Sequence, residues 1–342
     1  MQFGLFCSAQ ANTRELGPES GQGFRDYLDF NVEAEALGFT SSFLVEHHFT
    51  GWNQVSATLM LLMALAMRTK TLRLGSAVMV LPWHNPVLLA EQAATLDLVS
   101  GGRFDFGIGK GYRHSEFRGF QIPPEEADMR FNGAVEVMVR AFTTRERFSH
   151  HGRFWNFEDI VVEPPPAQKP HPPFWVAAAS EASIRGAAAR GFNLILDQYA
   201  SAQQIAERIG IYQAERRRRG LSYDPRQIAV ARQIYVATDA ADKQAALARQ
   251  AAYTQRTVGV SRQPGGGRGS HVLAYADKPG GTEENALFGT PGEIRAGLDA
   301  LQKAGAAYLL LTIAGGIEQL YRIARDIMPA YLGAGAAAHA AE

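Results

Sequence analysis

A regular alternation of short apolar runs with amphipathic segments constrains the fold of this 342-residue chain more than any other feature. The runs lack the polar alternation of half-exposed strands, which is typical of parallel strands covered by helices on one face and by the core on the other. We predict eight such strands, at Phe3–Ser8, Ser42–Glu46, Leu72–Leu81, Phe104–Gly109, Phe174–Ala178, Asn193–Leu196, Ile228–Ala237 and Tyr308–Ile313.

Helical periodicity occupies the intervals between these runs. Apolar residues recur at helical spacing from Phe24 to Val32, from Phe131 to Phe142 and from Ile317 to Met328. Start signals agree, with Asn85 as an N-cap before Pro86 and a capping box opening at Thr290. The pattern predicts an α/β fold, a (β/α)8 TIM barrel with insertions at its C-terminal face. A doubly wound open sheet is the structural alternative. We expect one barrel domain over residues 1–332 and a disordered tail over 333–342, which is mostly Ala and Gly.

The composition of the chain argues against nucleic-acid binding, membrane insertion and secretion. The 34 basic and 34 acidic side chains cancel, so bulk charge favours neither nucleic acid nor an anionic membrane. Cys7 is the only cysteine, which excludes an intrachain disulfide and fits a reducing compartment. The N-terminus has no basic leader before an apolar core, and the longest apolar stretch, Ala57–Met67, is shorter than the roughly 20 residues that a membrane span needs. We therefore predict a soluble, cytoplasmic protein.

Two segments interrupt the alternation. Gly152–Pro173 is predicted to form a small hairpin followed by a rigid proline-rich connector. Gln263–Thr282 is rich in glycine and is predicted to be a long loop that follows the seventh strand. Loops of this length in a compact domain are functional lids or disordered segments, and active sites of barrels lie at the C-terminal face. This loop is therefore our candidate for a lid.

The strongest chemical motif is Glu46-His47-His48, at the carboxyl end of the second strand. Adjacent side chains on a strand point to opposite sides, so one histidine should face the barrel mouth and the other should turn away. An imidazole beside a carboxylate suits general acid/base catalysis near neutral pH. A purely structural role is an equally good interpretation of these residues alone. A metal site is weaker, because successive strand residues do not readily share one ion and no H-x-x-x-H or matching Cys/His set is present.

Other candidates are less specific. Gly107-Ile108-Gly109-Lys110-Gly111 at the end of the fourth strand permits close backbone approach and offers a cation, but such glycines more often mark tight barrel packing. Ser180 and Ser183 open a helix after the fifth strand, where free N–H groups can bind an anion, although a serine N-cap is common. Arg130 is a second candidate for a phosphate partner, and a solvated arginine is its simpler interpretation.

Several ordered stretches together resemble the bacterial-luciferase-like flavin-dependent monooxygenases. The most specific is Ala90-Glu91-Gln92 through Leu96-Asp97, followed by Ser100-Gly101-Gly102-Arg103-Phe104-Asp105-Phe106-Gly107-Ile108-Gly109. The resemblance covers nearly the whole chain in order, and its remaining parts are Phe43–Phe49, Leu74–Pro82, Asn85–Val87, Arg130-Phe131, Gly152–Phe154, Pro170–Pro173 and Gly289–Pro291.

The resemblance implies a reduced FMN at the C-terminal barrel mouth. His47 corresponds to the histidine used in the family's flavin oxygen chemistry, and Glu46 would support the flavin ring or the strand end. The ring would rest on Ala77 and Val78, where the family often has a cis peptide bond. The remaining cofactor-binding positions carried over are Gly109, Lys110, Arg130, Ala179, Ser180 and Ser183. Two of these depart from luciferase, which has a reactive cysteine at the position of Gly109 and an acidic residue at that of Ala179.

The resemblance also implies partners. We expect a small-molecule substrate, O₂ and a homodimer, with no nucleic acid and no membrane. Because no nicotinamide-binding motif is present, we expect reduced FMN to come from a separate NAD(P)H:flavin reductase. Two other functions remain open at this point, a deazaflavin-dependent oxidoreductase on the same barrel and a non-catalytic flavin-binding protein.

Overall fold

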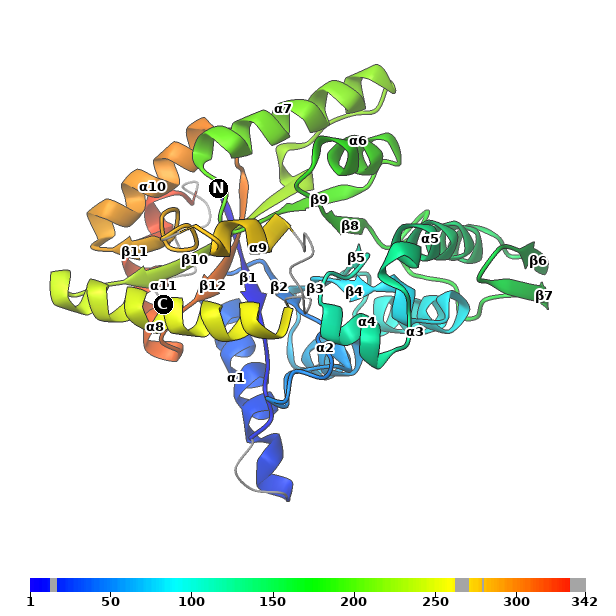
Figure 1. Cartoon of the computed structure of the whole chain (residues 1–342), viewed down its shortest axis with the longest axis horizontal. Coiled ribbons are helices and arrows are strands. Elements are labelled where there is room, and N and C mark those ends of the chain that lie inside the picture. Colours follow the sequence, from blue (N-terminus) through cyan, green and yellow to red (C-terminus); the bar gives the residue numbers. More distant parts are fainter. Residues whose placement is uncertain (13–16, 262–270, 279, 333–342) are drawn as a thin grey trace. The chain divides into compact units, whose positions relative to one another are not determined.

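A computed structural model describes residues 1–12, 17–261, 271–278 and 280–332 of the chain. The barrel strands are β1 (Gln2–Cys7), β2 (Ser41–Leu44), β3 (Arg73–Ser76), β5 (Phe104–Gly109), β8 (Phe174–Ala177), β9 (Asn193–Leu196), β10 (Ile228–Val236) and β12 (Tyr308–Ile313) (Figure 1). They pair in the order β10, β12, β1, β2, β3, β5, β8, β9, and β9 pairs with β10 in turn, which closes the barrel. The predicted (β/α)8 barrel is confirmed, and the open sheet is excluded.

The predicted strands agree with the observed ones to within two residues at each end, with one exception. The run predicted as one strand over Leu72–Leu81 is divided into β3 and a short β4 (Met79–Val80). The division falls at Ala77–Val78, whose peptide bond is cis, as the family resemblance implied.

Helices alternate with the barrel strands. They are α1 (Gln22–Ala36), α2 (Thr58–Arg68), α3 (Pro86–Val99), α4 (His114–Gly119), α5 (Ala127–Thr143), α6 (Glu181–Ala189), α7 (Ala202–Arg218), α8 (Ala240–Ser261), α9 (His271–Ala276), α10 (Pro291–Lys303) and α11 (Ile317–Asp326). The predicted start signals are confirmed. The Asn85 side chain accepts hydrogen bonds from the N–H groups of Val87 and Leu88, and Thr290 and Glu293 form a reciprocal capping box.

The chain divides into two compact units. Unit 1 comprises Met1–Cys7, Asp29–Phe43 and Val176–Glu342, and unit 2 comprises Ser8–Leu28 and Leu44–Trp175. The single domain expected over residues 1–332 stays a prediction, and the tail at 333–342 lies outside the described residues.

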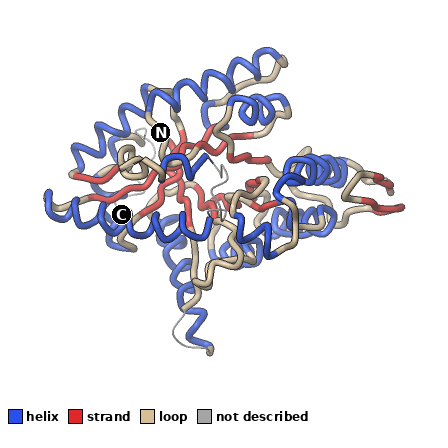
Figure 2. The backbone as a smooth tube through the Cα atoms, viewed as in Figure 1, coloured by secondary structure: helices blue, strands red, loops and turns tan. Residues whose placement is uncertain are grey.

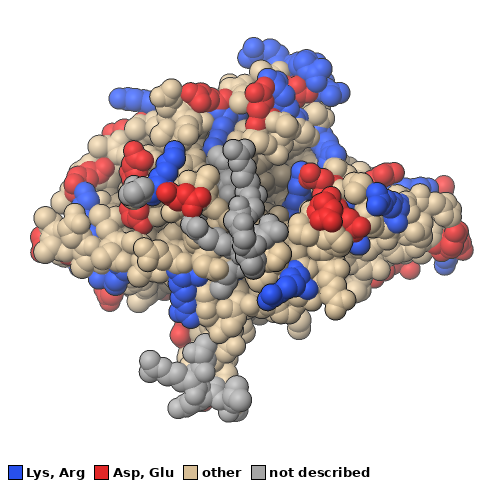
Figure 3. All heavy atoms as spheres, viewed as in Figure 1, with Lys and Arg blue, Asp and Glu red and all other residues tan. Residues whose placement is uncertain are grey.

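Unit 1 is built on long parallel pairings. Phe3 of β1 lies opposite Leu309 of β12, and β10 pairs with β12 from Ala229 to Ile234. All nine residues of β10 are buried. Figure 3 shows basic side chains gathered over the C-terminal part of α7, where Arg218 and Arg219 both pair with Glu215. These arginines are thus held by a carboxylate of their own helix.

Unit 2 contains β3 and β5, which pair in parallel. Every residue of β5 is buried, and the ring of Phe106 stacks on that of Phe174 with centroids 5.5 Å apart. A Cβ at Gly107 would collide with the carbonyl oxygen of Ser76, so a glycine is needed where β5 passes this backbone. The Ser76 hydroxyl donates a 2.8 Å hydrogen bond to the Gly107 carbonyl.

The two interruptions differ in part from expectation. The hairpin is present but begins earlier than Gly152, with strands β6 (Phe148–His151) and β7 (Asn156–Ile160), which stand apart from the other strands of their unit in Figure 2. The predicted loop over Gln263–Thr282 is wrong for His271–Ala276, which form α9. Residues 262–270 and 279 lie outside the described residues. A further short strand, β11 (Leu287–Gly289), pairs with β10 and was not predicted.

Candidate functional site

Glu46 is buried two residues beyond the end of β2, and its carboxylate joins three chain segments. One oxygen, Oε2, accepts a 2.6 Å hydrogen bond from the N–H of Val80 in β4. The other, Oε1, lies 3.0 Å from Nε2 of His48 and 2.7 Å from Nε2 of His84. This side chain therefore ties the segment after β2, strand β4 and the residues before α3 together.

The charge of Glu46 is stabilised where it lies. Burial alone would raise the pKa of this carboxyl, but the hydrogen bonds from His48, His84 and the Val80 N–H outweigh burial and hold its pKa below the ordinary value. Glu46 is therefore an anion at neutral pH, and its oxygens are occupied as acceptors. The arrangement suits a structural anchor better than a proton-transfer group.

His47 turns to a different carboxylate. Its Nδ1 lies 3.1 Å from Oε1 of Glu116, a buried residue of α4, and the same oxygen accepts a 3.0 Å hydrogen bond from the backbone N–H of His48. The two histidines thus point to separate partners. Among the described residues, Nε2 of His47 has no hydrogen-bond partner.

The environment keeps His47 neutral. Burial lowers the pKa of its imidazole, and the nearby Arg113 guanidinium lowers it further, while the Glu116 contact opposes both. A carboxylate at Nδ1 favours the tautomer that carries its proton on that nitrogen, so the lone pair is on Nε2. In that state His47 can accept a proton from a bound molecule.

Aromatic rings surround the histidines. Phe120 lies edge-on to His48 with centroids 4.8 Å apart, and Trp83 stacks on Phe120 at 5.2 Å and meets Phe117 at 4.6 Å. Trp83 therefore contacts both phenylalanines of this cluster.

The predicted flavin-ring residues meet at β4 and β5. A Cβ at Gly109 would collide with Cγ2 of Val78, which follows the cis bond from Ala77. The position at which luciferase has a cysteine is thus filled here by a valine side chain from the neighbouring segment.

The two predicted phosphate-binding cations are already paired in the structure. Lys110 forms an ion pair with Asp128. Arg130 binds Glu126 at 2.9 Å, and its guanidinium lies over the ring of Phe154, 4.3 Å from the centroid. Each of the two cations is therefore partly neutralised by a carboxylate of α5 or of the turn before it.

The remaining predicted residues belong to unit 1. Ser180 is the N-cap of α6, its hydroxyl accepts from the N–H of Ser183, and the two hydroxyls are 2.9 Å apart. Ala179 precedes this cap and is half-buried. Two hydroxyls and the first-turn N–H groups form a donor set of the kind that binds phosphate.

Three site residues were missed by the sequence analysis: Glu116, His84 and Arg113. Glu116 lies 69 positions from His47, and His84 lies 38 positions from Glu46. A weak signal existed for Glu116, which is an acidic residue close behind the glycines at the end of β5. Nothing in the sequence distinguishes His84 or Arg113.

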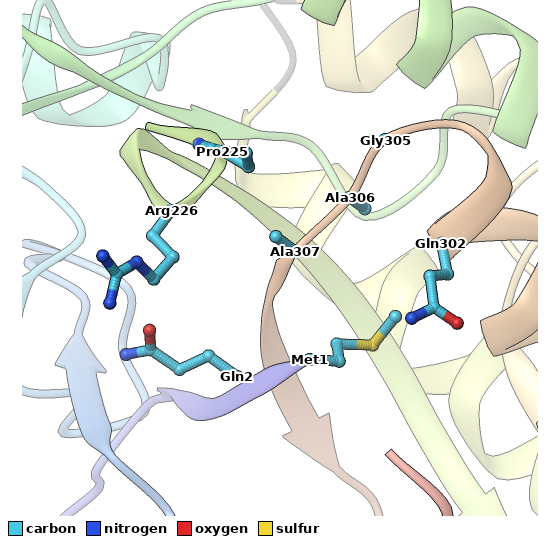
Figure 4. A pocket seen from close by; sticks show the side chains of 8 residues that line it. All are labelled: Met1, Gln2, Pro225, Arg226, Gln302, Gly305, Ala306 and Ala307. Atoms are coloured by element: carbon cyan, nitrogen blue, oxygen red, sulfur yellow. The ribbon is translucent and has the colours of Figure 1, made fainter. Parts of the chain in front are cut away.

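Two pockets in unit 1 are lined by residues other than these predicted site residues. One, of about 480 Å³, lies at the amino ends of β1 and β12, between residues such as Gln2, Arg226 and Gln302 (Figure 4). That end of a barrel contributes to stability rather than to catalysis. Another, of about 530 Å³, is lined by residues that include Tyr235, Asp242 and Arg322.

The described residues contain no cluster of three or more histidine, cysteine or acidic side chains placed to hold a metal ion. None of the described helices is both long enough and apolar enough to cross a bilayer.

Comparison with known proteins identifies the family. A family model described as luciferase-like monooxygenase matches residues 1–308. The oxygenase component of the flavin-dependent trigonelline monooxygenase of Acinetobacter baylyi is 28% identical over 196 residues, which are 57% of this chain and 53% of that protein. The chain thus spans about half the length of this curated relative.

Solved structures agree over almost the whole chain. The monooxygenase RslO1 from Streptomyces bottropensis superposes with a TM-score of 0.81 and 27% identity, covering 97% of this chain and 100% of that one. The oxygenating constituent of 3,6-diketocamphane monooxygenase from Pseudomonas putida, in complex with FMN, has a TM-score of 0.78 and 19% identity, covering 97% and 99%. The second likeness shows the fold alone.

Proposed function

The chain belongs to the luciferase-like monooxygenase family, and on that premise we propose that it is the oxygenase component of a two-component system that uses reduced FMN and O₂ to oxygenate a small organic substrate. The observation that carries the proposal is the pair of His47 and Glu116. Among the described residues, this pair leaves the neutral His47 imidazole without a hydrogen-bond partner at Nε2, and the Tyr112 ring lies edge-on to it with centroids 6.4 Å apart.

The residues present fit a flavin. Ala77, Val78 and Gly109 offer backbone and small apolar groups for a planar ring, and Glu46 anchors the strand behind them. Within unit 2, Lys110 and Arg130 offer cations to a phosphate. Within unit 1, Ser180, Ser183 and the backbone N–H groups after Ala179 offer neutral donors. When bound, reduced flavin supplies the two electrons that activate O₂.

The protein's own contribution is to hold a proton in place and keep water out. Glu116 fixes the His47 ring through Nδ1, so Nε2 can take a proton from a substrate or return one to it. Trp83, Phe117 and Phe120 form an apolar cluster that contacts His48, the neighbour of His47, and would limit the access of water to this side of the site.

The decisive experiment compares His47→Ala with His151→Ala, an exposed histidine of β6. We expect the turnover of His47→Ala to be about 10²- to 10⁴-fold lower than that of the wild type, which is the range for a general acid/base group. Its affinity for reduced FMN should be unchanged. His151→Ala should behave as the wild type. The substrate is first found by an oxygen-uptake screen with chemically reduced FMN against aldehydes, alkanes, sulfonates and thioethers, with product mass measured under ¹⁸O₂.

Three outcomes would count against the proposal. Failure of the wild type to bind reduced FMN at micromolar concentration would overturn it. Tighter binding of a reduced deazaflavin than of reduced FMN would favour the deazaflavin-dependent oxidoreductase. Full turnover by His47→Ala would remove the assigned role of the histidine.

The proposal includes a separate reductase. With FMN and NADH alone, the purified protein should not oxidise NADH continuously, and addition of a flavin reductase should start oxygen uptake. Steady NADH oxidation by the pure protein would contradict this part of the proposal.

We also propose a homodimer formed through α2. The side chains of Met60 and Met67 are 76% and 73% exposed, and their seven-residue spacing places them on one face of that helix. A helical face with two exposed methionines is suited to packing against a second copy of itself.

A further inference from the structure

Arg113 is a buried cation that the proposed chemistry does not yet use. It is the residue before α4, only 2% of its surface is exposed, and its Nη1 is buried without a hydrogen-bond partner among the described residues. Its Nε lies 3.4 Å from the hydroxyl of Tyr112, a long contact. A buried guanidinium with an unsatisfied donor is costly, so this arrangement calls for an anion.

The carboxylate nearest to Arg113 does not complete its coordination. Nη1 of Arg113 is 4.0 Å from Oε1 of Glu116, beyond hydrogen-bond distance. That same oxygen already receives His47 Nδ1 and the N–H of His48. Arg113 and His47 therefore share one carboxylate, and the positive group remains incompletely paired.

We propose that Arg113 binds a carboxylate of the substrate beside His47, so that the enzyme acts on a small organic acid. This inference rests on the proposed function and adds the substrate class to it. A guanidinium matches the planar, two-oxygen geometry of a carboxylate, and a charge-assisted hydrogen bond to Nη1 would satisfy the buried donor. The contact would also fix the position of the substrate relative to Nε2 of His47.

The proposal has an electrostatic consequence within the site. The charged groups around His47 are Glu116, Arg113 and Glu46, and burial together with Arg113 lowers the pKa of the imidazole. A bound anion would offset the charge of Arg113 and raise the pKa of His47. By linkage, carboxylates should bind more tightly as the pH falls through the titration of His47.

The test uses the full chain loaded with FMN and measures heats of binding for formate, acetate and benzoate against formamide, acetamide and benzamide. We expect at least one carboxylate to bind about tenfold more tightly than its amide, as for a charge-assisted hydrogen bond. Arg113→Gln should abolish that preference, and Arg113→Lys should retain part of it. Arg118→Gln, which changes an exposed arginine of the same helix, should leave it intact.

Several results would overturn the inference. They are equal binding of every carboxylate and its amide by the wild type, an equal loss in Arg118→Gln, and a loss of reduced-FMN affinity in Arg113→Gln as large as the loss of carboxylate affinity. The last result would assign the anion to the flavin rather than to the substrate.

Two measurements separate this inference from folding defects and from the proposed function. The pH dependence of carboxylate binding is read in the wild type and needs no variant, and affinity that weakens as the pH is lowered from 8 to 6 would contradict the inference. Wild-type affinity for reduced FMN is measured separately. If reduced FMN binds but carboxylates are not preferred, only the inference fails, whereas absence of FMN binding contradicts the proposed function.

Discussion

The three histidines of the site contact two different buried glutamates. Glu46 accepts from His48, His84 and a backbone N–H, so its charge is used to hold the chain in place. Glu116 accepts from one histidine ring, that of His47, and thereby orients the ring to which we assign proton transfer. The two acids differ in their neighbours rather than in their burial.

Glu116→Gln tests this division. The amide keeps the shape but cannot stabilise positive charge on His47, so turnover should fall about 100-fold while FMN affinity is kept. Because Glu116 raises the pKa of His47, its loss should also move the acid limb of the kcat profile to lower pH. The control is Glu125→Gln, at an exposed position. Unchanged turnover in Glu116→Gln would assign the glutamate a structural role.

Stability should fall in acid for a related reason. The pKa of His47 lies below its ordinary value of 6.5. As the pH falls below 6.5, the imidazole is therefore protonated in the unfolded chain before it is protonated in the folded chain. The histidine's contribution is complete above about pH 6.5 and declines as the pH drops below that value, by at most about 1.4 kcal/mol per pH unit. Urea midpoints at pH 7.5 and 5.5 measure this decline, and His47→Gln should reduce it. Equal slopes in both proteins would refute the assignment.

The carboxyl of Glu46 adds a second step at lower pH. Its pKa is also lowered, from 4.5, so its contribution to stability is present above that value and is lost as the pH falls through the folded pKa. The two declines begin at different pH values, because the ordinary pKa of the imidazole is 6.5 and that of the carboxyl is 4.5.

Between the strands, Val78 packs so closely against Gly109 that no room is left for a Cβ at that position. Gly109→Ala places a methyl group against Cγ2 of Val78, a β-branched side chain with little freedom to move, and should cost about 1–3 kcal/mol. Val78→Ala removes the obstructing atom, so the double variant should be more stable than the two separate effects predict. Urea unfolding of all four proteins measures the coupling, and strict additivity would show that the methyl is accommodated elsewhere.

The sequence predicted the elements whose signals are local. Eight apolar runs gave the barrel strands, and the caps at Asn85 and Thr290 gave two helix starts, because each depends on residues a few positions apart. It missed β11, whose three residues form a strand only by pairing with β10. It also missed α9, because the glycines that precede His271 suggested a loop throughout.

The site was predictable in its consecutive part only. Glu46, His47 and His48 are adjacent, so their chemistry can be read from the sequence. Their partners His84 and Glu116 enter from the segments before α3 and in α4, and no periodic signal links such distant positions. The phosphate-binding residues carried over from the family stay a prediction.

At the scale of the whole molecule, the proposed dimer predicts a change of mass. Met60→Glu combined with Met67→Glu places two like charges on the exposed face of α2 and should shift the protein to a monomer, because repulsion and desolvation oppose contact between two such faces. Sedimentation velocity at micromolar concentration measures the mass. Met129→Glu, at an exposed methionine of α5, is the control. A monomeric wild type would contradict the proposal.

The shared carboxylate of Glu46 also limits how this lineage can diverge. A substitution of Glu46 would leave Val80, His48 and His84 without an acceptor at once, so a single mutational step there should be strongly counter-selected. Relatives that lack this glutamate are expected to lack both histidines as well. In an alignment of relatives, the residues at positions 46, 48 and 84 should therefore change together, whereas the residue at position 47 should change with that at position 116.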